Sequence, residues 1–364
     1  MSESRPRLPP ETFDLPVDEI RSGYRSAVYF SRAKRVLEAE KPDTVATVQV
    51  FQKGSAVLCG IDEAIAVLRV GAGSWAAGGE WEPGFDQLEV DALHDGDRIE
   101  PWETVAHITG PLRLFVHLES VYLGLLARRT KVATNVAAVV DAAKGKPLLF
   151  FADRFDHYAT QGGDGYAAHV GGAFGVATDA MASWWGGKGL GTIPHGLIAA
   201  FGGDTVAATE AFARHVPDAD LIALVDFNND SVGDALACAH RFGERLWGVR
   251  LDTAEDLVDR AITAEPTDDF NPAGVNVMLV RLVREALDRA GFRHVRIVVS
   301  GGFDAERVGA FEEAGAPVDV YAVGSSLLRG RTDFTADVVA VDGKPMAKVG
   351  RRLRPNPRLA RVVA

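Results

Sequence analysis

The chain has 364 residues, of which 47% are hydrophobic, so it is long enough and apolar enough to form one large domain and a smaller one. Its net charge of −11 argues against nonspecific binding to nucleic acid, so an anionic substrate would need a local cluster of cations and backbone N–H groups. The two cysteines, Cys59 and Cys238, lack metal-ligand spacing, which favours reduced thiols in a cytoplasmic protein over a structural zinc site.

The longest apolar run lies near residues 112–127 and is interrupted by Arg113, His117 and Glu119. The N-terminus is charged and has no apolar segment behind it. We therefore expect neither a membrane span nor a signal peptide.

The first part of the chain has the patterns of a small, β-rich domain. Residues up to about 16 are rich in proline and charge, which is typical of an arm that packs elsewhere or stays mobile. Apolar alternation predicts strands at residues 44–60 and 103–108, with turns at Lys53-Gly54 and Asp95-Gly96-Asp97. A helix is expected at residues 33–39 and a loop at residues 71–85, which contain Trp75 and Trp81.

The middle of the chain predicts a larger α/β domain. After Gly110-Pro111, apolar residues at helical spacing predict two helices, around residues 114–125 and 130–143. Strand-like runs then alternate with helical ones, at residues 147–152, 189–193, 221–225, 246–251, 295–300 and 320–323. This alternation predicts an irregular parallel α/β barrel of the TIM type, with its chemistry at the carboxyl ends of the strands.

The last part of the chain returns to a β pattern. Strands are expected at residues 337–341 and 345–349 around the turn Asp342-Gly343, and they would rejoin the N-terminal sheet. We therefore expect a barrel domain at residues 111–327 and a discontinuous α+β domain at residues 1–110 plus 328–364. The arginines between residues 351 and 361 are interpreted as a solvated or interface face.

His195 is the first candidate for a functional side chain, because glycines surround it and allow a ligand to approach the backbone closely. Pro194 restricts the residue before it to an extended conformation, so the imidazole would emerge at a strand end. The alternative is an ordinary turn before a helix at residues 204–215, with the histidine merely hydrogen-bonded at the surface.

Polar residues also follow the other predicted strands. Alternation puts Arg250 and Asp252 on one face of their strand, either to meet a ligand or to form a mutual salt bridge. Asp226 could place Mg²⁺ beside a pyrophosphate, and Asp230 could do the same or cap the helix that follows. Small residues that favour phosphate binding close the last two strands, namely Ser300, Gly301, Gly302, Gly324 and Ser325.

Residues 191–198, Gly-Thr-Ile-Pro-His-Gly-Leu-Ile, resemble the Gly-Thr-x-Pro-His-x-Leu-Ile segment of nicotinate phosphoribosyltransferases. Other segments resemble the same family in the same order, from about residue 23 to residue 358. Residues 151–154 resemble its Phe-x-x-Arg element, and residues 248–253 its Gly-x-Arg-x-Asp-Ser/Thr strand end. Residues 26–29 align with its Thr/Ser-Asp-x-Tyr element.

The resemblance implies formation of nicotinate mononucleotide and pyrophosphate from nicotinate and phosphoribosyl pyrophosphate, with Mg²⁺ and coupled ATP hydrolysis. His195 would be transiently phosphorylated by ATP. Phe151 and Tyr29 would stack on the pyridine ring, and Arg154 would bind its carboxylate, unless Arg154 instead pairs with Asp153 or Asp156. Tyr29 would act across the interface of a homodimer with shared active sites. Arg250 would contact nicotinate or pyrophosphate, and Asp252 the ribose hydroxyls.

Two positions depart from the family pattern. Ala27 and Phe174 stand where the family usually has aspartate, and Phe174 is expected to make part of the pocket apolar. These departures motivate one alternative, a non-catalytic homologue that binds a nucleotide or a partner. The nearest enzymatic alternative is a quinolinate phosphoribosyltransferase-like enzyme, which has a related barrel.

Overall fold

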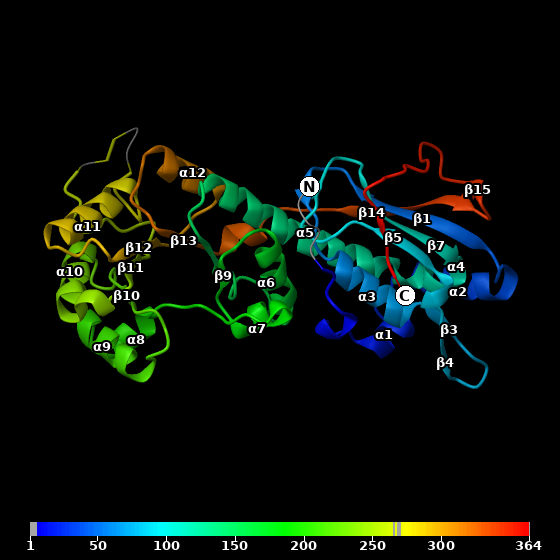
Figure 1. Cartoon of the computed structure of the whole chain (residues 1–364), viewed down its shortest axis with the longest axis horizontal. Helices are drawn as coiled ribbons and strands as arrows, with labels where there is room; N and C mark the ends of the chain where they lie inside the picture. The colour runs from blue at the N-terminus through cyan, green and yellow to red at the C-terminus, as the bar shows by residue number, and fades with distance from the viewer. Residues whose placement is uncertain (1–5, 265, 268–270, 364) are drawn as a thin grey trace. The chain divides into compact units, whose positions relative to one another are not determined.

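The computed structural model describes residues 6–264, 266–267 and 271–363. Contacts between Cα atoms divide the chain into two compact units (Figure 1). Unit 1 comprises the residues up to Thr134 and those from Gly330 onward, and unit 2 comprises Asn135–Arg329. The N-terminal unit thus extends beyond the boundary expected near residue 110, because the helices after that point pack on its core: Phe115, Leu118, Tyr122 and Leu126 belong to it.

Unit 1 is built on an antiparallel sheet with the order β15-β14-β1-β7-β5-β16. Its strands are β1 (Val45–Gln52), β5 (Glu89–Ala92), β7 (Thr104–Pro111), β14 (Phe334–Val341), β15 (Lys344–Pro345) and β16 (Ala360–Arg361). Because β14 pairs antiparallel with β1, the C-terminal strand rejoins the N-terminal sheet, as predicted. Two short pairs add β2 (Ala56–Val57) with β6 (Arg98–Ile99) and β3 (Gly73–Trp75) with β4 (Trp81–Pro83).

The helices of unit 1 are α1 (Val17–Arg21), α2 (Val28–Glu40), α3 (Ile61–Gly71), α4 (Leu112–Phe115) and the first part of α5 (Glu119–Ala142). α3 is buried along most of its length, and Ile61, Ile65 and Leu68 pack into the core against the sheet. α5 is a single helix where the sequence predicted two, since no glycine or proline interrupts residues 125–142.

Unit 2 contains a curled parallel sheet with the order β10-β11-β12-β13-β8-β9 (Figure 1). Its strands are β8 (Leu148–Phe150), β9 (Gly175–Val176), β10 (Ile222–Leu224), β11 (Gly248–Leu251), β12 (Arg296–Val299) and β13 (Val320–Val323). The helices are the rest of α5 with α6 (Gln161–Val170), α7 (Asp179–Ala182), α8 (His195–Ala200), α9 (Thr205–His215), α10 (Ser231–Phe242), α11 (Val277–Arg289) and α12 (Ala305–Glu313). The expected fold class, a parallel α/β barrel with a smaller discontinuous domain, is therefore confirmed.

One predicted strand is wrong. Residues 189–193 form no strand, and the N–H of Leu190 instead donates to the carbonyl of Val176 at 2.7 Å, just beyond the pairing of β8 with β9. The glycines there lower the tendency to form a strand. The segment is therefore extended but irregular, and it leads directly into α8.

The expected loop at residues 71–85 is also wrong, because it contains the β3–β4 hairpin. Trp75 and Trp81 face each other across this hairpin, with ring centroids 5.1 Å apart in an edge-on arrangement. Cross-strand aromatic pairs of this kind stabilise short hairpins.

Both ends of the described chain are held on unit 1. Arg7 donates to Asp62 at 2.9 Å, which places the described end of the N-terminal arm against α3. Two of the C-terminal arginines form ion pairs with carboxylates of unit 1 while their side chains stay exposed: Arg358 pairs with Glu103 at 2.8 Å and Arg361 with Asp91 at 2.7 Å. In the described part of the chain, no helix has both the length and the apolar character needed to cross a membrane.

Candidate active site

The candidate site is a cavity of about 570 Å³ in unit 2, at the carboxyl ends of the parallel strands. Side chains and turns that follow four different strands converge there, which is where open and closed parallel α/β sheets place ligands. Its lining residues are Phe151, Asp153, Arg154, Phe155, Pro194, His195, Gly196, Arg250, Asp252, Ser300, Gly301, Gly302, Phe303, Ala322, Gly324 and Ser325.

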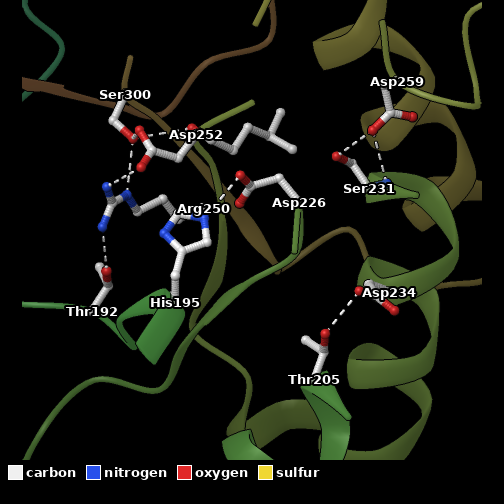
Figure 2. Close-up of polar contacts among 11 residues, drawn as sticks. Thr192, His195, Thr205, Asp226, Ser231, Asp234, Arg250, Asp252, Asp259 and Ser300 are labelled. Carbon is white, nitrogen blue, oxygen red and sulfur yellow. Dashed lines mark hydrogen bonds and ion pairs between the residues drawn. The ribbon is translucent and has the colours of Figure 1, made fainter. Parts of the chain in front are cut away.

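His195 and Asp226 form a polar pair at this site (Figure 2). His195 is the first residue of α8, and its Nε2 lies 3.1 Å from Oδ2 of Asp226, which follows β10. The imidazole is 47% exposed whereas the carboxylate is only 5% exposed, so the ring sits at the mouth and its partner beneath it. Burial raises the pKa of the Asp226 carboxyl, and the contact with His195 partly opposes this rise.

Arg250 is the centre of a second polar group (Figure 2). Its Nη2 donates to Oδ2 of Asp252 at 2.8 Å, its Nε to Ser300 at 2.9 Å and its Nη1 to Thr192 at 2.9 Å. Arg250 and Asp252 are thus on one face of β11 and form a salt bridge, which was one of the two alternatives for this pair. Both still line the cavity, so the ion pair is part of the site.

Arg154 and two aromatic rings lie on the β8 side of the cavity. Arg154 is exposed and makes no ion pair within the described chain; its guanidinium lies 5.5 Å from the ring centroid of Phe155. Neither expected ion pair, with Asp153 or with Asp156, forms at Arg154, and its charge faces the cavity instead. Phe151 is half-buried, with the Arg250 guanidinium 5.6 Å from its ring centroid.

Glycine is required at two of the turns that follow the last strands. A Cβ at Gly324 would lie 2.5 Å from the Phe155 ring and 2.9 Å from the backbone oxygen of Phe151. Gly302 has a φ of +66°, and a Cβ there would lie 2.0 Å from a carboxylate oxygen of Glu255. Close packing at both positions, together with the positive φ of Gly302, explains why these turns carry glycine.

Carboxylates outside the cavity hold the loops that bear the site (Figure 2). Asp234 accepts hydrogen bonds from Thr205 at 2.8 Å and from Asn228 at 3.2 Å, which joins the start of α9 to the loop after β10. Asp259 accepts two from Ser231, at 3.0 Å from its N–H and 2.7 Å from its hydroxyl. Asp226 is therefore presented by a loop that neighbouring elements hold in place.

Two expected pocket residues do not line the cavity. Phe174 is 72% exposed, and its N–H donates to the carbonyl of Leu148, the first residue of β8. Phe174 precedes β9, so it lies at the amino ends of the parallel strands, whereas the cavity lies at their carboxyl ends. The expectation that Phe174 makes the pocket apolar is therefore wrong. Tyr29 belongs to α2 of unit 1, where it is 65% exposed.

The residues that sequence reasoning missed are Thr192 and the cavity-lining Asp153, Phe155 and Phe303. Thr192 lies in the motif around His195, yet nothing in the local pattern indicates that its hydroxyl faces Arg250. Asp230, which was expected to bind Mg²⁺ or to cap a helix, is the N-cap of α10 and accepts from the N–H of Gly233 at 3.0 Å.

The described residues contain no group of three or more histidines, cysteines or acids placed to hold a metal ion. Near the cavity, Asp226 offers a suitable donor, because its Oδ1 is buried and has no hydrogen-bond partner among the described residues. A single carboxylate oxygen fits Mg²⁺ whose other ligands are substrate oxygens and water, which is how this ion is often bound.

Comparisons with known proteins agree with this fold. Residues 27–130 match the family profile described as quinolinate phosphoribosyl transferase, N-terminal domain. The chain is 32% identical over 270 residues to nicotinate phosphoribosyltransferase pncB1 of Mycobacterium tuberculosis, an alignment that covers 71% of this chain and 55% of that protein. The chain thus spans about half the length of the curated relatives it matches.

Among solved structures, nicotinate-nucleotide pyrophosphorylase from Pyrococcus furiosus matches with a TM-score of 0.78 at 30% identity, covering 97% of this chain and 86% of that one. Human nicotinic acid phosphoribosyltransferase matches with a TM-score of 0.67 at 20% identity, covering 90% and 77%, and this likeness shows the shared fold.

A curled parallel sheet with glycine turns and arginines at its carboxyl edge, joined to an antiparallel domain, defines a barrel-type phosphoribosyltransferase fold. Within that class, the chain belongs to the family that includes these nicotinate phosphoribosyltransferases and the nicotinate-nucleotide pyrophosphorylase of Pyrococcus furiosus.

Proposed function

We propose that the protein transfers a phosphoribosyl group from phosphoribosyl pyrophosphate to nicotinate, forming nicotinate mononucleotide and pyrophosphate with coupled ATP hydrolysis. The observation that supports this most is that His195, Arg154 and Arg250 line one cavity. His195 is also paired with the buried Asp226. The relatives named as nicotinate phosphoribosyltransferases support the same substrates.

Recognition of nicotinate would rest on Arg154 and Phe151. A guanidinium can donate two parallel hydrogen bonds to a planar carboxylate, and the half-buried ring of Phe151 offers the pyridine an apolar face. Nicotinamide carries a neutral amide and cannot form an ion pair with Arg154, so this geometry favours the acid over the amide.

The chemical barrier is the departure of pyrophosphate from the anomeric carbon of ribose, which leaves a cationic, oxocarbenium-like centre. The C–O bond to pyrophosphate breaks as the pyridine nitrogen forms the new C–N bond. Backbone N–H groups of the turns at Gly301-Gly302 and Gly324-Ser325 would hold phosphate oxygens, and Asp252 would hold the ribose hydroxyls. Mg²⁺, when bound, would be held by Asp226 and would neutralise charge on the leaving group.

His195 would couple the transfer to ATP. A hydrogen bond from its Nε2 to Asp226 leaves the lone pair on Nδ1, which can attack the γ-phosphorus of ATP while ADP leaves. Asp226 would stabilise the imidazolium character that develops in that step. Hydrolysis of the phosphohistidine would then restore the starting state and drive the cycle forward.

The decisive experiment is incubation with γ-labelled ATP. The wild type should acquire an acid-labile label, and His195→Ala should not, while retaining at most a slow ATP-independent transfer. A matched control is His240→Ala, because His240 lies on α10 and does not line the cavity. Acid-labile label that persists in His195→Ala would sink the assignment.

A second candidate function is quinolinate phosphoribosyl transfer, which the profile match at residues 27–130 favours. Quinolinate has two carboxylates, so its pocket needs several uncompensated cations. Among the described residues that line this cavity, Arg250 is paired with Asp252 and Arg154 is the arginine without an ion pair. Nicotinate, with one carboxylate, suits this charge better.

Steady-state assays with nicotinate, nicotinamide and quinolinate, each with and without ATP, distinguish the candidates. Turnover of nicotinate that ATP stimulates supports the main proposal, and ATP-independent turnover of quinolinate supports the second. Absence of turnover with nucleotide binding intact would indicate a non-catalytic homologue, the alternative that Ala27 first raised.

We further propose a homodimer in which Tyr29 of one chain covers the pyridine ring held by Phe151 and Arg154 of its partner. The exposed aromatic and aliphatic side chains on and before α2, among them Tyr24, Val28 and Tyr29, suit burial in an interface.

A further inference from the structure

The side chain of Arg250 is held by two hydroxyl groups, and neither of them was expected to serve this purpose (Figure 2). Ser300 accepts a hydrogen bond from Nε at 2.9 Å, and Thr192 accepts one from Nη1 at 2.9 Å. Together with Asp252 on Nη2, they give each nitrogen of the guanidinium one oxygen partner. A planar group held at three nitrogens has one allowed orientation.

Ser300 has no hydrogen-bond donor left for a ligand. Its backbone N–H donates to the carbonyl of Leu251 at 2.9 Å, just beyond the pairing of β12 with β11. Its hydroxyl oxygen lies 2.7 Å from Oδ1 of Asp252 and 3.1 Å from the carbonyl oxygen of Leu251, so its single proton is donated to these acceptors. The same oxygen accepts a hydrogen bond from Arg250. A hydroxyl has one proton, so a phosphate could be bound only by breaking these contacts.

Thr192 connects Arg250 to the segment that bears His195. Thr192 lies three residues before His195, in a stretch without regular secondary structure. Its hydrogen bond to Arg250 joins this stretch to β11. His195 in turn contacts Asp226 after β10. Two side-chain contacts therefore set the position of the histidine segment against two neighbouring strands.

We propose that Thr192 and Ser300 are positioning residues that hold Arg250 in its ligand-binding orientation, and that Ser300 is not itself a phosphate ligand. This inference rests on the proposed function in so far as Arg250 contacts the substrate. Thr192 would also keep Arg250 in register with His195.

The test is a double-mutant cycle in the full-length protein, read out as the affinity for nicotinate mononucleotide by calorimetry. This probe carries both a pyridine carboxylate and a phosphate, so it reports on Arg250 whichever group that residue meets. Thr192→Val, which keeps the shape but not the hydroxyl, should weaken binding roughly tenfold, as loss of a hydrogen bond to a charged group does. Thr192→Ser should restore affinity close to that of the wild type.

In an Arg250→Ala background, Thr192→Val and Ser300→Ala should cause no further loss, because both act through the missing guanidinium. The control is Thr209→Val, since Thr209 is a buried threonine of α9 whose hydroxyl donates to the backbone of its own helix. Thermal melts check that each variant is folded, and Thr192→Ala serves as a second variant without the hydroxyl.

The outcomes distinguish the roles proposed for Thr192, Ser300 and Arg250. If Thr192→Val binds as well as Thr209→Val while Arg250→Ala is weakened, the inference for Thr192 fails and the role of Arg250 stands. If Ser300→Ala weakens binding as much without Arg250 as with it, Ser300 contacts the ligand itself and the inference for Ser300 fails. Unchanged affinity in Arg250→Ala would overturn both the proposed role of Arg250 and this inference.

Discussion

At the scale of single residues, the two arginines that line the cavity differ in their pairing. His195 contacts Asp226, and Arg250 forms an ion pair with Asp252, so each of these groups has a partner before any substrate arrives. Arg154 is exposed and has no ion pair within the described chain. The guanidinium that is free to select the substrate is therefore Arg154.

Arg154→Ala should weaken nicotinate binding by roughly 2 kcal/mol, about 30-fold, because a hydrogen-bonded carboxylate would lose its charged donor. Binding of nicotinamide should hardly change, since the amide carries no charge. Arg154→Lys should recover part of the loss but not the paired geometry of a guanidinium. Titration calorimetry with the two pyridines checks this, and unchanged nicotinate affinity in Arg154→Ala would move the role to Arg250.

At the scale of secondary-structure elements, caps and buried carboxylates hold the loops of both units. Asp230 caps α10 in unit 2, and Asp95 accepts a hydrogen bond from the N–H of Ile61, the first residue of α3 in unit 1. In each case a carboxylate satisfies a helix N–H that has no partner within the helix. These residues are thus explained by stability rather than by chemistry.

Asp230→Ala should lower the free energy of unfolding by about 1 kcal/mol, because the N–H of Gly233 loses its acceptor. Asp230→Ser keeps a capping oxygen and should be nearly as stable as the wild type. Chemical denaturation of the three proteins measures the difference. If Asp230→Ser instead changed the Mg²⁺ dependence of turnover without affecting stability, the metal-binding alternative for Asp230 would return.

The stability of unit 1 should depend on pH through Asp95. Burial, together with the neighbouring Asp62, raises the pKa of this carboxyl to about 7, although Arg7 opposes the rise. An unfolded aspartate has a pKa of about 4, so between the two values the folded protein binds the proton more tightly. This contribution is fully present below about pH 4 and is lost as the pH rises through 7.

Asp95→Asn carries no titrating proton and should remove this part of the pH dependence. Thermal melts from pH 4.5 to 8 should show the wild type losing stability relative to the variant as the pH rises. Asp86→Asn is a suitable control, because Asp86 is exposed. A difference in melting temperature between wild type and Asp95→Asn that stays constant over this range would contradict the assignment.

At the scale of the whole molecule, the two units contribute different parts of the proposed site. Unit 2 holds the cavity, whereas Tyr29, the second ring expected to stack on the pyridine, is on α2 of unit 1. A two-fold dimer repeats every contact, so the proposed arrangement makes two such sites.

Mixing Tyr29→Ala chains with Arg154→Ala chains should restore activity, because each heterodimer would contain one intact pocket. After re-equilibration at equal amounts, about half of the dimers are heterodimers, so roughly a quarter of all pockets should be intact. Turnover of the mixture, compared with that of each parent, measures the effect. Mixtures that stay inactive while heterodimers are demonstrably present would show that Tyr29 does not act across the interface.

The sequence by itself determined most of what is local in this protein. Strand-like runs located five of the six strands predicted for the parallel sheet, and the turn at Asp342-Gly343 was correctly placed before β15. The family motifs named the residues at the carboxyl ends of those strands, and Phe151, Arg154, His195 and Arg250 do line one cavity. These features depend on a few consecutive residues, so they can be inferred without a fold.

Only the tertiary structure decided which of these residues meet. His195 contacts Asp226 across 31 positions, and Thr192 contacts Arg250 across 58. Phe174 lies at the amino ends of the parallel strands, away from the cavity, because it comes before its strand and not after it. Such pairings depend on strand register and on the path of irregular loops, which are properties of the packed chain and leave no pattern in the local sequence.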